Sequence, residues 1–185
     1  SLCGKMVAIL VSLLIPLVNA IELNITLWPI NSDGTVRIPF FFDDNTIKKG
    51  DTRRTTFLKA VGRYKDCTCI EWVQVPRNET PGNVLVRDNN QGCSTQLGLE
   101  DSGTNNISLA GRCNKLGIML HEMAHTLGMG HTHQRPDRDS YVEIWKQNVM
   151  DAYRIFFDIM GWKSTYGTPY DYLSIMHYSS MHFSF

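Results

Sequence analysis

Four of the chain's six histidines lie within thirteen consecutive residues, and a glutamate directly follows the first of them. In a helix, His121 and His125 lie on one face about 6 Å apart, close enough for both imidazoles to bind a single cation. Glu122 then projects from an adjoining side, where its carboxylate can reach a water on that cation. Gly128 allows a sharp turn after the helix, so that His131 can return to the same ion. Three neutral imidazoles leave one coordination position open, which is typical of catalytic rather than structural zinc.

A short His-Glu-x-x-His motif alone also occurs on surface helices whose histidines only face solvent. The longer motif His-Glu-x-x-His-x-x-Gly-x-x-His fixes five positions over eleven residues, and SIMHY at 174–178 is typical of the methionine turn of this zinc class. We therefore predict one catalytic zinc ion on the three motif histidines. The histidines outside the motif are expected to be structural or surface residues: His133, His177 and His182.

This arrangement predicts hydrolytic chemistry. Bound zinc lowers the pKa of a water toward about 7 and polarises the scissile carbonyl. Glu122 can accept the proton of that water and deliver it to the leaving amine. A metal-storage or structural zinc domain is disfavoured by the open coordination position and by the base beside it.

The elements that must position these residues follow from the apolar pattern. A helix is predicted from about residue 115 to 127, with Asn114 as its N-cap and Gly128 just past its end. Upstream, a second helix is predicted over 45–64, and its candidate core residues are Ile47, Phe57, Leu58 and Val61. Strand-like segments lie at 27–42, with a turn at 31–34, and at 69–75, 83–87 and 107–110.

The size and charge of the chain limit its class. A chain of 185 residues is enough for one domain with a real core. Its 18 basic and 18 acidic residues cancel, so there is no electrostatic attraction toward nucleic acid or an anionic membrane. We expect no nucleic-acid partner, and the oligomeric state is left open.

The N-terminal segment predicts secretion. A largely apolar run of thirteen residues, from Met6 to Val18, follows Lys5 and precedes Asn19-Ala20. This pattern is typical of a secretory signal peptide, here residues 1–20. An uncleaved membrane anchor is the alternative, but the run is too short to cross a hydrocarbon core of about 30 Å, and Pro16 interrupts it. We therefore expect an extracellular protein without stable membrane insertion after cleavage.

Cysteines and sequons are consistent with that compartment, where cysteines usually pair. Cys67 and Cys69 are too close to bridge each other without strain, whereas Cys93 and Cys113 flank a polar segment that can fold back. We favour a disulfide between Cys93 and Cys113, with free buried thiols as the alternative. Glycosylation is predicted from three sequons, which begin at Asn24, Asn78 and Asn106.

The segments HEMAHTLGMGHTHQRPDRDSY and SIMHY resemble the motifs of the astacin family of metzincin zinc endopeptidases. The resemblance extends from Leu27-Trp28-Pro29 through Thr68-Cys69-Ile70 and the pair Cys93 and Cys113 to the last residue. It implies an α+β fold of the zincin type. In that fold a mixed twisted sheet and two long helices form an N-terminal subdomain, followed by an active-site cleft and an irregular C-terminal subdomain.

The resemblance also implies roles for individual residues. The three motif histidines bind zinc and Glu122 is the general base. Tyr178, after the methionine turn, is a displaceable zinc ligand that helps to stabilise the transition state, and Met176 is a hydrophobic floor beneath the zinc. Family substrates are polypeptides bound extended and antiparallel to an edge strand, which is expected near residues 93–98.

Two features depart from the family pattern. Thr132 stands where the family typically has a glutamate that contacts the buried mature N-terminus, so no charged anchoring pair is expected there. We find no counterpart of the family's pro-segment, with its zinc-occupying aspartate, between residues 20 and 27. At the C-terminal end we expect the family's last helix to be missing, together with the cysteine that pairs with the one at Cys69. We predict a secreted zinc metalloendopeptidase whose peptidase domain covers 21–185. A catalytically impaired astacin-like binding or extracellular-matrix protein is the alternative.

Overall fold

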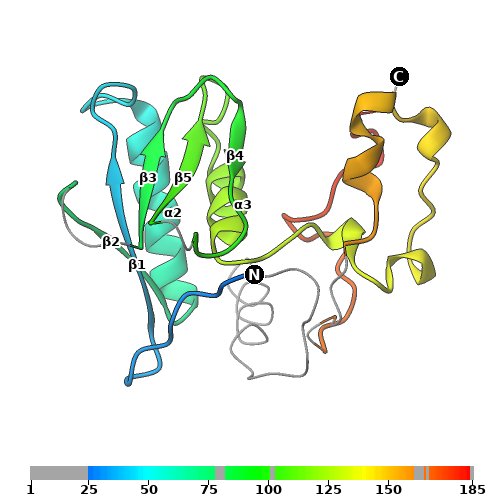
Figure 1. Ribbon diagram of the computed structural model, residues 1–185, viewed down its shortest axis with the longest axis horizontal. Helices are drawn as coiled ribbons and strands as arrows, with labels where there is room; N and C mark the ends of the chain where they lie inside the picture. Colours follow the sequence, from blue (N-terminus) through cyan, green and yellow to red (C-terminus); the bar gives the residue numbers. More distant parts are fainter. Residues whose placement is uncertain (1–24, 78–81, 101–102, 161–164, 166, 184–185) are drawn as a thin grey trace. The chain divides into compact units, whose positions relative to one another are not determined.

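The computed structural model describes residues 25–77, 82–100, 103–160, 165 and 167–183 (Figure 1). The described chain forms two compact units, one ending at Met129 and the other beginning at Gly130. The predicted signal peptide and the sequons at Asn24 and Asn78 lie outside the described residues. Among the residues that are described, no helix combines the length and apolar character needed to cross a membrane.

A five-stranded sheet lies at the centre of the N-terminal unit, with the strand order β2-β1-β3-β5-β4. Its strands are β1 (Val36–Phe42), β2 (Ile70–Gln74), β3 (Asn83–Arg87), β4 (Cys93–Thr95) and β5 (Thr104–Leu109). The first four in this order pair in parallel, whereas β4 runs antiparallel to β5 at the edge. The sheet is therefore mixed, as the family resemblance implies.

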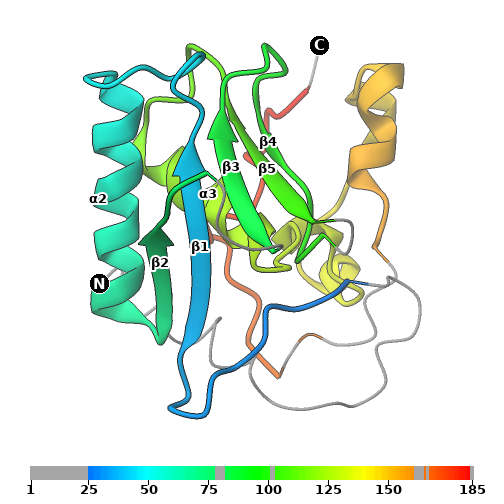
Figure 2. The same cartoon turned by 60° about the vertical axis from the view of Figure 1, so that its left-hand side comes forward.

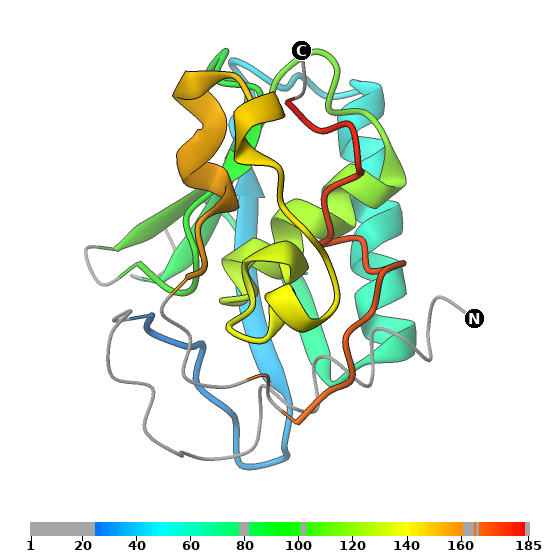
Figure 3. The same cartoon turned by 90° about the vertical axis from the view of Figure 1, so that its right-hand side faces the viewer.

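Two helices lie against one face of this sheet (Figures 2 and 3). They are α2 (Thr52–Cys67) and α3 (Leu116–Thr126). The ring of Phe40 on β1 lies 5.1 Å from that of Phe57 on α2, and both side chains are almost fully buried. The buried Tyr64 hydroxyl donates a 3.0 Å hydrogen bond to the Leu120 carbonyl. This bond ties α2 to α3, the helix that carries the zinc motif.

Some details of the helices differ from the sequence-based expectation. The first helix begins at Thr52 rather than near residue 45, because Asp51 accepts a 2.9 Å hydrogen bond from the Arg53 amide and caps it. Leu58 is 44% exposed, so its assignment to the core was wrong. It follows the fully buried Phe57 and therefore points about 100° further around the helix, away from the sheet.

The predicted N-cap of the zinc-motif helix was also wrong. The cap position is Lys115, which makes no side-chain capping bond. Asn114 instead donates to the Thr52 hydroxyl at 2.7 Å and accepts from the Thr56 hydroxyl at 2.6 Å. Its side chain therefore holds the start of α3 against the start of α2.

The disulfide that we favoured from the sequence is present in the N-terminal unit. Cys93 and Cys113 form a disulfide with a Cα–Cα distance of 5.6 Å. This bridge joins the edge strand β4 to the segment just before α3. Cys69 has a free thiol in the described structure.

The C-terminal unit is irregular, as expected from the family resemblance. Within its described residues, regular structure is limited to short 3-10 helices, which are η1 (Thr132–Gln134), η2 (Arg138–Ser140), η3 (Lys146–Asn148) and η4 (Asp151–Phe157). The buried Arg138 guanidinium donates to the carbonyls of His133 at 2.9 Å and Phe157 at 2.6 Å. One cation thereby holds together segments that no described sheet connects.

Candidate metal centre

The first two motif histidines lie on one face of α3. The ring centroids of His121 and His125 are 4.5 Å apart, and the planes are inclined by 85°. Positions four apart in a helix are neighbours on its surface, so this pair follows directly from the sequence spacing. Met119, Leu120 and Met123 are almost fully buried and anchor the helix in the core.

The end of α3 is fixed by contacts from distant parts of the N-terminal unit. The Trp28 indole donates a 2.8 Å hydrogen bond to the Thr126 carbonyl, and the Gly98 amide donates to the His125 carbonyl at 3.0 Å. Gly128 then turns the chain with φ +96°, a conformation that favours glycine. These contacts fix the end of α3, and the chain turns at Gly128 directly after it.

Two of the histidines are oriented by hydrogen bonds from Nδ1. His125 Nδ1 lies 2.6 Å from the Met129 carbonyl, and His131 Nδ1 lies 3.1 Å from Oε1 of Gln134. Because a carbonyl oxygen only accepts, the proton of His125 belongs on Nδ1. Nε2 then carries the lone pair of the neutral ring, which is the usual arrangement for a metal-binding histidine.

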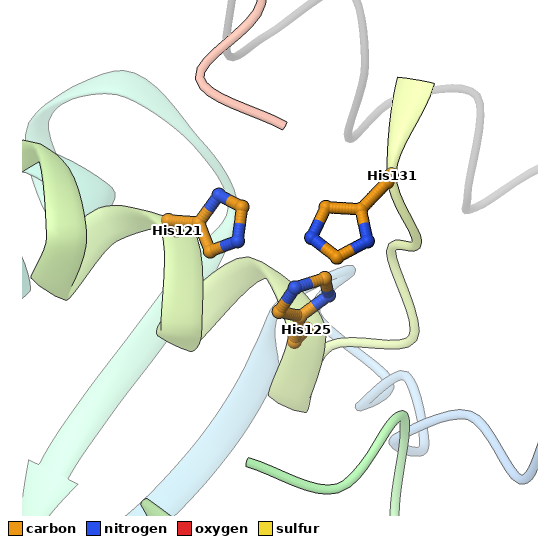
Figure 4. A group of neighbouring side chains, drawn as sticks. All are labelled: His121, His125 and His131. Atoms are coloured by element: carbon orange, nitrogen blue, oxygen red, sulfur yellow. The ribbon is translucent and has the colours of Figure 1, made fainter. Parts of the chain in front are cut away.

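Figure 4 shows the three imidazoles of the motif gathered around a common space. His121, His125 and His131 each offer one ligand nitrogen, and these nitrogens all lie within 4.8 Å of one another. Zinc binds histidine nitrogen at about 2.0–2.1 Å, so ligand atoms grouped this closely suit the binding of one ion. The structure therefore brings together the three predicted ligands.

Glu122 is buried on α3, with only 5% of its surface exposed. Its Oε2 atom has no hydrogen-bond partner within the described part of the chain. Burial raises the pKa of Glu122 to about 7, because desolvation penalises the charged carboxylate. A buried carboxylate oxygen without a described protein partner, on the helix that also carries His121 and His125, fits a site that holds a cation and water, and the three-imidazole donor set fits zinc.

The methionine turn and its tyrosine lie beside the last histidine within the C-terminal unit. The Thr132 amide donates a 2.9 Å hydrogen bond to the carbonyl of Met176, which is almost fully buried. The ring of Tyr178 lies 4.5 Å from that of His131. Within this unit, the methionine turn is therefore bonded to the residue after His131, and Tyr178 lies against the His131 ring.

The remaining histidines differ from one another in environment. His133 is almost fully buried, whereas His182 is exposed and His177 is half-buried with Nε2 2.8 Å from the Tyr170 hydroxyl.

The sequence did not predict the hydrogen bonds by which Trp28 holds the end of α3 and Gln134 orients His131. Only the three-residue spacing from His131 to Gln134 could have indicated the second support, and no local pattern indicates the first.

Comparisons with known proteins agree with this geometry. Residues 22–185 match the family model of the astacin peptidases. The chain is 35% identical over 151 residues to an astacin-like metalloendopeptidase of Coturnix japonica, covering 82% of this chain and 36% of that protein. It is also 35% identical over 149 residues to the dorsal-ventral patterning protein tolloid of Drosophila melanogaster, covering 80% of this chain and 14% of that protein.

A solved structure shows the same likeness in three dimensions. High choriolytic enzyme 1, a hatching enzyme zinc-protease from Oryzias latipes, matches with a TM-score of 0.79 and 32% identity. The match covers 90% of this chain and 80% of that one. The chain thus spans most of the matched structure, but only about a third or less of the two relatives named above.

Proposed function

The chain belongs to the astacin family, and from this premise we propose that it is a secreted zinc-dependent metalloendopeptidase. One zinc ion is held by His121, His125 and His131. Glu122 is the general base and Tyr178 stabilises the transition state. The observation that carries the proposal is the gathering of three imidazole ligands on and after the helix that also buries Glu122.

When bound, zinc polarises the scissile carbonyl and makes water a nucleophile near neutral pH. Glu122 takes up the proton of the attacking water on its carboxylate and passes it to the nitrogen of the leaving amine. Its burial supports this role, because a raised pKa places the carboxyl close to the working pH of such a base.

The Tyr178 hydroxyl donates to the oxyanion as the tetrahedral carbon forms. The contact between its ring and that of His131 supports this role, because it keeps the phenol next to a zinc ligand. A donor that engages only the developing charge raises kcat rather than substrate affinity.

The substrate is an extended polypeptide that pairs with the edge strand β4. Within the described residues, β4 pairs only with β5, which leaves its other edge available for backbone hydrogen bonds. Such pairing recognises an extended backbone with little dependence on sequence. The disulfide between Cys93 and Cys113 anchors this edge at its first residue.

Export to the extracellular space belongs to the same proposal. Residues 1–20 have the pattern of a signal peptide, and the Cys93–Cys113 disulfide suits an oxidising compartment. Glycosylation at the sequons Asn24, Asn78 and Asn106 is part of this proposal.

A catalytically impaired binding or matrix protein is the second candidate. Thr132 favours it, because this residue replaces the glutamate that the family typically uses at a buried position. Thr132 is also buried in this chain, with 8% exposure, so the difference from the family's glutamate lies in the interior of the protein.

The deciding experiment measures zinc content and cleavage of an unfolded protein substrate for the parent chain and for Glu122→Gln. The amide keeps the shape of the carboxylate but cannot accept the proton. We expect equal, stoichiometric zinc in both proteins, chelator-sensitive cleavage by the parent, and a loss of roughly 100- to 10,000-fold in the variant. Equal cleavage rates in two folded, zinc-loaded proteins would overturn the enzyme proposal.

A further inference from the structure

Two histidines outside the zinc motif stack on the ring of Tyr178. The ring centroids of His133 and Tyr178 are 4.1 Å apart with an interplanar angle of 28°. Those of His182 and Tyr178 are also 4.1 Å apart, with an angle of 17°. Both of these histidines are among the described residues, and they make no ring contact with each other. Two rings stacked this closely on the same face would touch, so His133 and His182 cover opposite faces of the phenol.

The inner histidine is held rigidly. His133 is 1% exposed, and its Nε2–H donates a 2.9 Å hydrogen bond to the Phe156 carbonyl. Its own carbonyl accepts from the buried Arg138 guanidinium at 2.9 Å. These contacts fix one wall against which the Tyr178 ring rests.

The outer histidine belongs to an exposed turn that is closed by its own hydrogen bond and attached to η4 through the next residue. The His182 amide donates to the Ser179 carbonyl at 3.1 Å. The next residue, Phe183, stacks on Tyr153 of η4 with ring centroids 4.3 Å apart and planes inclined by 7°. The second wall is therefore close to solvent but attached to the rest of the unit.

We propose that His133 and His182 are positioning residues that clamp the Tyr178 ring on both faces and thereby aim its hydroxyl. The inference rests on the proposed function of Tyr178 and extends it. The Tyr178 ring can rotate about its χ1 and χ2 torsions. Rings packed against both of its faces oppose every motion that tilts or flips the ring out of its plane. A donor that is already aligned needs no reorganisation when negative charge develops on the substrate.

The experiment concentrates on His182, because it is exposed and its replacement does not disturb the core. His182→Leu removes the flat ring, His182→Phe keeps one, and Ser180→Ala is the control in the same exposed turn. For His182→Leu we expect a fall of roughly 3- to 10-fold in kcat, with KM and zinc content unchanged. We expect His182→Phe to restore most of that loss and Ser180→Ala to match the parent.

The same leucine substitution is then made in a Tyr178→Phe background. Tyr178→Phe alone is expected to lower kcat by roughly 100-fold, because it removes an oxyanion donor. If His182 acts through the hydroxyl, His182→Leu has no further effect there. An equal fall in both backgrounds, or no fall in the parent, overturns the clamp.

A second measurement does not depend on activity. In zinc-loaded protein carrying ring-labelled tyrosine, NMR line shapes report how fast the Tyr178 ring flips, and Tyr178→Phe assigns the signal. We expect faster flipping in His182→Leu than in the parent or in His182→Phe. Unchanged flipping refutes the clamp, whereas inactivity of the parent alongside the expected flipping refutes only the proposed function.

Discussion

Thr132 shows how one buried side chain separates this chain from the usual family pattern. It directly follows the proposed ligand His131, is 8% exposed, and its amide donates a hydrogen bond to the Met176 carbonyl. A glutamate here would need a cationic partner, because a buried unpaired carboxylate loses several kcal/mol of solvation. Threonine fills the position without a charge and therefore needs none.

Thr132→Glu is accordingly expected to destabilise the zinc-loaded protein by about 3 kcal/mol at pH 7, measured by urea unfolding. The cost should be smaller at pH 4, where the introduced carboxyl can be protonated. Thr132→Val is the matched control and should change stability by less than about 1.5 kcal/mol. A glutamate variant as stable as the parent at pH 7 would mean that a cation already faces this position.

Residues of the site differ in how far the sequence predicts them. The grouping of the three histidines follows from helical spacing plus a turn, so the amino-acid sequence alone is enough to predict that His121, His125 and His131 come together. It is not enough to predict the contacts of Tyr178 with His133 and His182. The first spans 45 residues of irregular chain, and no periodicity connects ring positions across such a segment.

At the scale of elements, the exit from α3 depends on space as well as on backbone conformation. A Cβ atom on Gly128 would lie 2.8 Å from the Leu27 Cδ2 atom, while φ is +96°. Gly34 has a similar φ of +82° with nothing within 4 Å of a Cβ atom. An alanine at Gly34 therefore tests the cost of the backbone conformation alone, whereas an alanine at Gly128 adds the cost of steric crowding.

Gly34→Ala should destabilise the protein by about 1–2 kcal/mol, and Gly128→Ala by more. Zinc affinity should fall only in Gly128→Ala, because that turn directs His131, and a chelator titration measures it. Leu27 is 46% exposed, so adding Leu27→Ala should recover the larger part of the crowding cost, while Ile25 Cγ2 still lies 3.3 Å from the new Cβ atom. Equal unfolding free energies for the two single variants would show that crowding at Gly128 is negligible.

The start of α2 is an ionic junction between three elements. Asp51 caps the helix, and Arg53 donates from Nη1 to the Asp88 carboxylate after β3 at 2.7 Å and to the Leu109 carbonyl of β5 at 2.5 Å. The hydrogen bond from Arg53 is the largest cause that lowers the pKa of Asp51. A lowered folded-state pKa means that the ion pair contributes stability above the unfolded pKa of about 3.9, and that this contribution is lost as pH falls through the folded value.

Asp51→Asn keeps the capping oxygen but removes the charge. We expect it to cost about 1 kcal/mol at pH 7, where the pair is intact, and much less near pH 3. Urea unfolding at both pH values measures the difference. Asp151→Asn, which removes a carboxylate that is 86% exposed, is the control and should have no measurable effect. If Asp51→Asn costs the same at both pH values, the lost stability comes from the geometry of the helix cap and not from the ion pair.

The elements predicted best are those with a clear apolar period. The strands at 70–74 and 83–87 and the helix that carries the zinc motif were recognisable because one face of each is buried. The prediction of Asn114 as the N-cap was wrong because the side chain of a good capping residue can form hydrogen bonds elsewhere, here to two threonines of α2. Capping preference is a local signal, and a tertiary contact between helix starts outweighed it.

The molecule as a whole joins a regular unit to an irregular one. Up to Met129 the fold is held by sheet pairing and an apolar core, which leave periodic patterns in the sequence. From Gly130 onward it is held by single side chains such as Arg138 and by ring contacts, which leave none. For this reason the sequence predicts the first unit in outline, and only the family resemblance predicts the irregularity of the second.

An ion held by the three motif histidines should contribute directly to the stability of the whole chain. A ligand that binds only the folded state adds RT ln(1 + [L]/Kd), about 2.7 kcal/mol at a free zinc concentration of 100 Kd. For a chain of this length, that corresponds to a rise of roughly 5–10 °C in Tm. Circular dichroism melting with zinc and with chelator measures it. His131→Gln should show little difference between the two conditions, because one of three ligands is lost; an unchanged zinc-dependent shift in that variant would exclude His131 as a ligand.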